Sequence, residues 1–133
     1  MRDITIDLHV ARNDAGASYA FRTRSLIVEG KVRGSFIPGA TARVCAVKAM
    51  TEALTKSDLP FGDGDTIQFR ISTDGPGLES LVNQGSGDQA ADAAFRACVR
   101  QLSLKGVTFC FDTTTEIDAT LKTHGEMARM LGY

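Results

Sequence analysis

The chain opens with a strict alternation of apolar and polar side chains, which predicts a β-strand over Asp3–Val10. The apolar positions are Ile4, Ile6, Leu8 and Val10, and the polar positions between them are Thr5, Asp7 and His9. A carboxylate in the middle of a strand is unusual, because strands disfavour aspartate and their centres are partly buried. Asp7 is therefore either at a tolerant edge or retained for a function.

Two more strands are predicted before the pattern changes. After a turn rich in Asn, Asp and Gly, aromatic and β-branched residues predict a second strand over Ser18–Glu29. Gly30 and Lys31 then provide a turn into a third strand, Val32–Ile37, which Pro38 ends. Together the three strands are expected to form an antiparallel meander.

The apolar spacing then becomes helical, which predicts a helix over Ala40–Leu54. Its apolar stripe is expected to contain Val44, Val47, Thr51 and Leu54, and its alanines would let it lie close to a sheet. A fourth strand is predicted over Thr66–Ser72, and it leads into the sharp turn Thr73-Asp74-Gly75. A short helical turn is predicted over Leu78–Asn83.

The last part of the chain alternates helix, strand and helix. Ser86 and Gln89 are spaced as a capping box for a helix. Its apolar stripe comprises Ala91, Ala94, Phe95, Cys98, Val99 and Leu102. A fifth strand is predicted over Gly106–Phe111, and Thr113 with Glu116 is read as the capping box of the last helix. That helix is expected to bury Ile117, Leu121, Ala128 and Leu131, with His124 in the same register.

Composition is that of one soluble globular domain spanning residues 1–133, with 43% hydrophobic and 23% charged residues. No apolar run approaches the ~20 residues of a membrane span, and the first residues lack signal-peptide features. We therefore expect a cytoplasmic protein without membrane association. The odd number of widely spaced cysteines predicts reduced core residues, with no disulfide or zinc motif: Cys45, Cys98 and Cys110.

Charge is distributed unevenly along the chain, although the net charge is only −1. Residues 1–56 contain nine Lys/Arg and five acids, whereas residues 57–133 contain six Lys/Arg and eleven acids. Two solvated faces of opposite sign would explain this, and charge alone favours that reading. The alternative is a basic face for phosphates beside an acidic pocket. Arg22 and Arg24, on one face of the second strand, likewise fit solvated edge charges or a phosphate-contacting ridge.

The order strand-strand-strand-helix-strand-helix-strand-helix resembles the ribonuclease H fold, over nearly the whole chain. Short motifs agree with it. Asp7 is followed by Asn13 and Gly16, as in the first strand of that family, and Thr73-Asp74 is similar to the end of its fourth strand. Met50–Leu54 resembles the end of its first helix. The resemblance implies an α/β domain with a five-stranded mixed sheet and helices packed on the sheet.

The resemblance also implies a chemistry, in which clustered carboxylates hold Mg²⁺ or Mn²⁺ ions ~4 Å apart to cleave phosphodiesters. The catalytic acids would be Asp7, Asp74 and Asp118, and the metal ligands Asp7, Asp74 and Glu116. The partner implied is an RNA–DNA hybrid or another duplex, contacted by Arg12, Asn13, Arg22, Arg24 and Arg43.

The sequence departs from the family in two places. The first helix lacks the family's carboxylate, and Arg43 or Val44 stands in its place, so that Arg43 could neutralise Asp7 or Asp74. The histidine-bearing loop before the last helix is also missing, since the capping residues join the fifth strand directly to that helix, and His124 falls in helical register within it.

Three functions follow from this combination. The first is a ribonuclease H-like domain with a degraded metal site and weak or no hydrolysis, which binds nucleic acid or a protein partner. The second is an active Mg²⁺-dependent nuclease that uses Asp7, Asp74 and an acid of the last helix. The third is a structural or protein-interaction module, in which Asp7 pairs with Arg43 and no nucleic acid binds.

Overall fold

The computed structural model describes residues 2–56, 61–73, 85–114, 116 and 118–131. Asp74 and the short helical turn predicted over residues 78–83 lie outside these described residues, as does Ile117.

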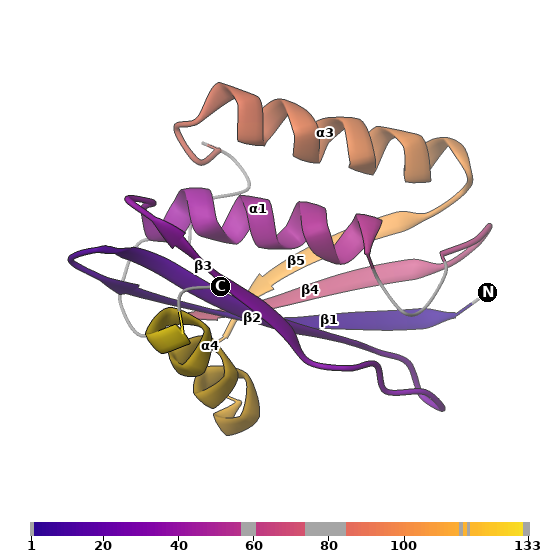
Figure 1. Cartoon of the computed structure of the whole chain (residues 1–133). Helices are drawn as coiled ribbons and strands as arrows, with labels where there is room; N and C mark the ends of the chain where they lie inside the picture. Colours follow the sequence, from indigo (N-terminus) through magenta and orange to yellow (C-terminus); the bar gives the residue numbers. More distant parts are fainter. Residues whose placement is uncertain (1, 57–60, 74–84, 115, 117, 132–133) are drawn as a thin grey trace.

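A five-stranded mixed sheet forms the centre of the molecule, as Figure 1 shows. Its strands are β1 (Asp3–Asn13), β2 (Gly16–Arg24), β3 (Arg33–Pro38), β4 (Thr66–Thr73) and β5 (Thr108–Thr113). They lie in the order β3-β2-β1-β4-β5. The first three pair antiparallel, and β4 and β5 run parallel to β1. The predicted α/β class, meander and element order are thus confirmed.

Helices cover both faces of this sheet (Figure 1). Helices α1 (Ala42–Thr55) and α3 (Gln89–Leu104) lie on one face, and α1 packs against α3, β1 and β2. Helix α4 (Ala119–Leu131) lies on the opposite face and packs against β1, β2 and β3. None of the helices described is long and apolar enough to span a membrane.

The alternation in β1 separates the main core from a polar face. Ile4, Ile6, Leu8 and Val10 are fully buried in the hydrophobic core. Since successive side chains of a strand point to opposite faces, Asp7 projects from the other face, toward α4. The predicted strand therefore places its carboxylate on the face that the core does not occupy.

The second strand is shorter than its sequence predicts, because β2 ends at Arg24 instead of Glu29. Arg24 pairs with Thr5, and β1 itself begins at Asp3, so that a longer β2 would soon have no partner residue on β1. Residues 25–32 form a loop instead, and the predicted turn at Gly30 and Lys31 lies within it. β-Propensity alone does not extend a strand beyond its partner.

Helix α1 buries Val47 and Leu54 as predicted, but not Val44 and Thr51, the other two residues of the predicted stripe. Its buried face combines small residues with a few larger apolar ones: Cys45, Ala46, Val47, Ala49, Met50, Ala53 and Leu54. Val44 and Thr51 are only partly buried, and the Thr51 hydroxyl donates to the carbonyl oxygen of Val47 at 3.0 Å. The face that carries Ala46, Ala49 and Ala53 is buried because its small side chains let the helix backbone lie close to the sheet.

The predicted start of α3 and end of α4 also differ from the structure. Asp88, and not Ser86, caps α3, because its side chain accepts from the Ala91 N–H. The Ser86 hydroxyl donates instead to Asp92 at 2.8 Å. Leu131, expected in the core, is 63% exposed, since it lies in the last turn of α4.

Candidate functional site

A charged pocket of about 240 Å³ lies beside Asp7, where β1 and β2 pass the start of α4. Its ionisable lining comes from three strands and from the segment before α4: Asp7, Arg22, Arg24, Arg70, Glu116 and Asp118. Strand pairing explains part of this grouping. Asp7 is the antiparallel partner of Arg22 and the parallel partner of Arg70. The sheet register therefore sets the carboxylate between two arginine-bearing positions.

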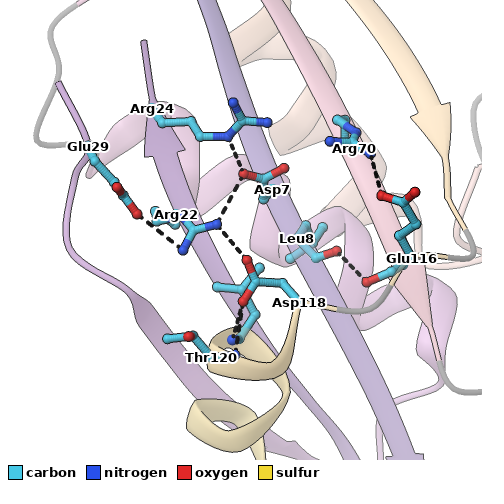
Figure 2. A network of polar contacts seen from close by, with 11 residues as sticks. Asp7, Leu8, Arg22, Arg24, Glu29, Arg70, Glu116, Asp118 and Thr120 are labelled. Carbon is cyan, nitrogen blue, oxygen red and sulfur yellow. Dashed lines mark hydrogen bonds and ion pairs between the residues drawn. The ribbon is translucent and has the colours of Figure 1, made fainter. Parts of the chain in front are cut away.

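Two guanidinium groups contact the Asp7 carboxylate, as Figure 2 shows. The Arg24 Nε donates to Asp7 Oδ2 at 2.6 Å, and Arg22 Nη2 lies 3.5 Å from the same oxygen. The Asp7 side chain is only 13% exposed. A carboxylate so little hydrated requires compensation, and here arginines from the neighbouring strand supply it.

Arg22 connects Asp7 to two further acids. Its Nη2 donates to Asp118 Oδ2 at 2.6 Å, and its Nη1 lies 3.2 Å from Glu29 Oε1 (Figure 2). Burial alone would lower the pKa of Arg22, but the hydrogen bond and the charges of these carboxylates outweigh it and raise that pKa. The guanidinium therefore stays charged and holds three carboxylates at one point.

Asp118 serves both this network and helix α4. Its Oδ1 accepts from the backbone N–H groups of Thr120 at 2.9 Å and Leu121 at 3.2 Å, which is the geometry of an N-cap. Burial alone would raise the pKa of Asp118, but the Arg22 hydrogen bond and these backbone donors lower it. Because the helix begins at Ala119, Asp118 precedes its first turn.

The capping box predicted from Thr113 and Glu116 is therefore wrong. Thr114, and not Thr113, makes the local contact, since its hydroxyl accepts from the Glu116 N–H at 3.1 Å. An aspartate two to three residues before free N–H groups satisfies them better, and this sets the start of the helix at Ala119. Glu116 lies outside the helix, with its side chain 88% exposed.

Among the described ionisable residues that line the pocket, Arg70 was not predicted from the sequence. Its Nη2 lies 3.7 Å from Glu116 Oε2, and its side chain is 34% exposed. The sequence did contain a signal for it, because Arg70 is a charged residue in the middle of the alternating strand β4, as Asp7 is in β1. Arg24, with a side chain 39% exposed, is the other partly open cation at the pocket.

Arg12, Asn13 and Arg43, the other predicted site residues that the structure describes, do not line this pocket. Arg12 is exposed near the end of β1, and Asn13 shapes the following turn by accepting from Ala15 N–H and Gly16 N–H. Arg43 donates to the carbonyl oxygen of Gly85 at 2.6 Å. In the described part of the chain, the ion-pair partners of Asp7 are Arg22 and Arg24, so the predicted Arg43–Asp7 pair is not formed.

The described acids around the pocket do not fit a divalent metal ion in this arrangement. Among the described residues, no three His, Cys, Asp or Glu side chains are grouped so that they could hold one. Asp7 and Asp118 each offer an oxygen to Arg22, and the other Asp118 oxygen caps α4. A hard cation needs several oxygens free to converge on it. It would have to displace guanidinium groups that already supply the positive charge.

Comparison with known proteins finds relatives in structure only. No protein-family model and no curated protein matches the chain. RNase H1 from the halophilic archaeon Halobacterium salinarum NRC-1 is 16% identical, with a TM-score of 0.63 over 98% of this chain and 99% of that one. The N-terminal RNase H domain of a Mycobacterium tuberculosis protein, solved as a fusion with maltose-binding protein, is 9% identical. Its TM-score is 0.64, over 98% of this chain and 99% of that one.

A third solved structure, LC11-RNase H1 in complex with an RNA/DNA hybrid, is 12% identical. Its TM-score is 0.62, and the match covers 97% of this chain and 99% of that one. These likenesses extend over nearly the whole chain at low sequence identity.

Proposed function

We propose that this chain, which has the ribonuclease H-like fold over nearly its whole length, is a nucleic-acid-associated domain with weak or no hydrolytic activity. Its partner would be an RNA–DNA hybrid or another duplex, held through backbone phosphates at the pocket beside Asp7. The chain has the fold, but its described acids are not arranged for the metal chemistry.

The observation that carries the proposal is the pairing of Asp7 with Arg22 and Arg24. Phosphodiester cleavage by two metal ions requires carboxylates that converge on cations at the scissile phosphate. Here the carboxylate in the middle of β1 is compensated by fixed guanidinium groups, so that it has little remaining charge to attract a metal ion. Such a site can retain a role in binding while losing hydrolysis.

Two arginines at the pocket support phosphate binding. Arg24 and Arg70 are partly exposed, and each has one carboxylate partner among the described residues. A guanidinium group carries five N–H donors, so it can keep one carboxylate contact and still donate to a phosphate oxygen. Arg12 and Arg43 lie apart from the pocket, and we propose them only as outlying contacts along a bound duplex.

A structural or protein-interaction module without nucleic acid is the second candidate. Charge balance favours it, because three arginines and three acids line the pocket and the whole chain has a net charge of −1. The active nuclease is the third possibility and would need Asp7, Asp74 and either Asp118 or Glu116 to hold Mg²⁺ or Mn²⁺. Binding and cleavage measured together separate all three.

The test uses a fluorescently labelled RNA–DNA hybrid, with binding followed by anisotropy at several salt concentrations and cleavage followed on a gel. We expect salt-sensitive binding and an intact hybrid in Mg²⁺ or Mn²⁺. Arg70→Met should weaken binding and lower the salt slope by about one, whereas the matched control Lys105→Met, at the end of α3, should change neither. Absence of binding favours the interaction module, and cleavage that Asp7→Asn abolishes identifies a nuclease.

A further inference from the structure

The loop between β2 and β3 exposes three consecutive apolar residues to solvent. Leu26 is 100% exposed, Ile27 90% and Val28 46%. Single apolar residues on a surface are common, but three in a row on one loop forgo burial that folding would otherwise use. We call Leu26–Val28 the apolar tip. Figure 1 shows this loop at the end of the sheet where the N-terminus lies, beyond the strands.

Hydrogen bonds hold the apolar tip in this exposed position. The Ser25 N–H donates to the Val28 carbonyl oxygen at 2.7 Å, and the Val28 N–H donates to the Ser25 hydroxyl at 3.2 Å. At the base of the loop, the Gly30 N–H donates to the Thr23 carbonyl oxygen at 2.7 Å. A loop ordered in this way is preorganised, so that presenting Leu26 and Ile27 to a partner costs little additional entropy.

The apolar tip is continuous with the charged pocket. Arg24, which lines the pocket, precedes Leu26 by two residues. On the other side of the tip, Glu29 Oε1 lies 3.2 Å from Arg22 Nη1, and the backbone of Glu29 forms an isolated antiparallel β-bridge with that of Arg24. Residues of the same ionic network, Arg24 and Glu29, therefore flank the tip on both sides.

The charge around the apolar tip indicates the chemistry of its partner. Residues 22–33 contain four basic residues, Arg22, Arg24, Lys31 and Arg33, and the single acid Glu29, whereas the whole chain has a net charge of −1. Carboxylates already hold Arg22, so the positive charge that this segment turns to solvent is that of Arg24, whose side chain is 39% exposed, and of the exposed Lys31 and Arg33. A segment with this charge and an apolar end is complementary to a polyanion with an apolar interior. A nucleic acid duplex, with phosphates outside and stacked bases inside, has this character.

We infer that the apolar tip inserts Leu26 and Ile27 into the base stack of a duplex whose phosphates lie at Arg24 and Arg70. This inference rests on the proposed function and adds a second mode of contact to it. Apolar wedges between base steps unstack them at a cost, which the burial of the inserted side chains offsets. The arginines position the duplex, and the tip locally distorts it.

The experiment uses a short RNA–DNA hybrid and a DNA duplex of the same sequence, each containing one 2-aminopurine, a base whose fluorescence rises when it is unstacked. The native chain is compared with Leu26→Ser/Ile27→Ser and with the control Leu104→Ser, an 82% exposed leucine at the end of α3. We expect the native chain and the control to raise the fluorescence of at least one probe. The tip variant should lose this signal and bind roughly tenfold more weakly, with an unchanged salt slope.

Failure of this inference is distinct from failure of the proposed function. If the tip variant binds and unstacks like the native chain, the wedge is refuted while nucleic acid binding stands. If the native chain binds neither probe, both are refuted. Vesicles of phosphatidylcholine and phosphatidylserine provide a further arm. Binding to these vesicles that only the tip variant loses, together with unaltered binding to both duplexes, would show that the tip is a membrane contact and overturn the wedge.

Discussion

At the residue scale, Arg22 joins carboxylates that would otherwise repel one another. It contacts Asp7 from β1, Asp118 from the start of α4 and Glu29 from the loop after β2. The Arg22 side chain is only 15% exposed, so these contacts are screened by solvent less than those of a surface pair. Removing one partner from such a network leaves charges that are poorly hydrated and uncompensated.

Replacement of Arg22 by Met is therefore expected to lower the free energy of unfolding by about 2 kcal/mol, somewhat less than for a fully buried pair. Arg12→Met, at an exposed position on β1 away from the pocket, is the matched control and should change stability by less than about 0.5 kcal/mol. Urea denaturation measures both. Equal effects of the two substitutions would contradict the role assigned to Arg22.

Asp65 provides a pH-dependent test away from the pocket. This buried carboxylate accepts from the Arg2 guanidinium at 2.8 Å and from the Gly62 N–H at 2.8 Å. The Arg2 hydrogen bond, more than any other contact, lowers the pKa of Asp65. A carboxyl group whose pKa is lower in the folded state stabilises the fold above its unfolded-state pKa of about 4, and this contribution is lost as the pH falls through the folded-state pKa.

Asp65→Asn is accordingly expected to destabilise the protein by about 1 to 2 kcal/mol at neutral pH. Urea midpoints of the native chain and the variant should converge when the pH is lowered well below about 4, where the native carboxyl group is protonated. A gap that stays constant over this range would show that the charge of Asp65 contributes nothing.

At the element scale, the start of α4 links the helix to the ionic network through Asp118. Asparagine caps a helix about as well as aspartate but cannot form the ion pair with Arg22, whereas alanine does neither. Asp118→Ala should therefore be less stable than Asp118→Asn by about 1 kcal/mol, the usual value of an N-cap. Thermal and urea unfolding of the two variants measure this difference. Equal stabilities would place the start of the helix elsewhere.

The approach of α4 to the sheet depends on a glycine in β3. A Cβ at Gly34 would lie 2.5 Å from the Tyr19 carbonyl oxygen and 2.8 Å from the His124 ring. Gly34→Ala is thus expected to lower the free energy of unfolding by about 2 kcal/mol, because either the backbone of β2 or helix α4 must move. The control is Gly62→Ala, whose Cβ would approach Asp65 only to 4.0 Å. Comparable losses in urea denaturation would argue against the tight contact.

How well each element could be predicted depended on whether its signal is local. The alternation in β1 identified four fully buried residues, Ile4, Ile6, Leu8 and Val10, because the two faces of a strand differ consistently. The end of β2 was missed, since it depends on where β1 begins and not on the apolar character of Leu26 and Ile27. The start of α4 was placed too early, because several residues before Ala119 can cap a helix.

At the scale of the whole molecule, the fold was predictable and the charge pairing was not. The order of strands and helices follows from local patterns, and it leads to the β3-β2-β1-β4-β5 sheet. One of the three hypotheses paired Asp7 with Arg43, but the register between β1 and β2 supplies Arg22 and Arg24 instead. Asp118 meets Arg22 across 96 positions of sequence, a contact that only the packing of α4 on the sheet creates.

Charge compensation around Asp7 also has a consequence for the whole molecule. The residues around Asp7 neutralise one another through guanidinium groups, and the described acids are not grouped as metal ligands. A domain of this kind should hold nucleic acid by its phosphates with no requirement for a divalent cation. Its affinity should depend on total salt, through the counterions that the phosphates release.

The most direct test of this claim is the affinity of the native chain for a labelled RNA–DNA hybrid, measured by anisotropy in EDTA and in Mg²⁺ at matched ionic strength. We predict the same dissociation constant in both, weakening as salt is raised, and a hybrid of unchanged length at the end of the titration. Binding that appears only with Mg²⁺, or a hybrid shortened in its presence, would contradict the account and show that the acids around Asp7 act on metal ions after all.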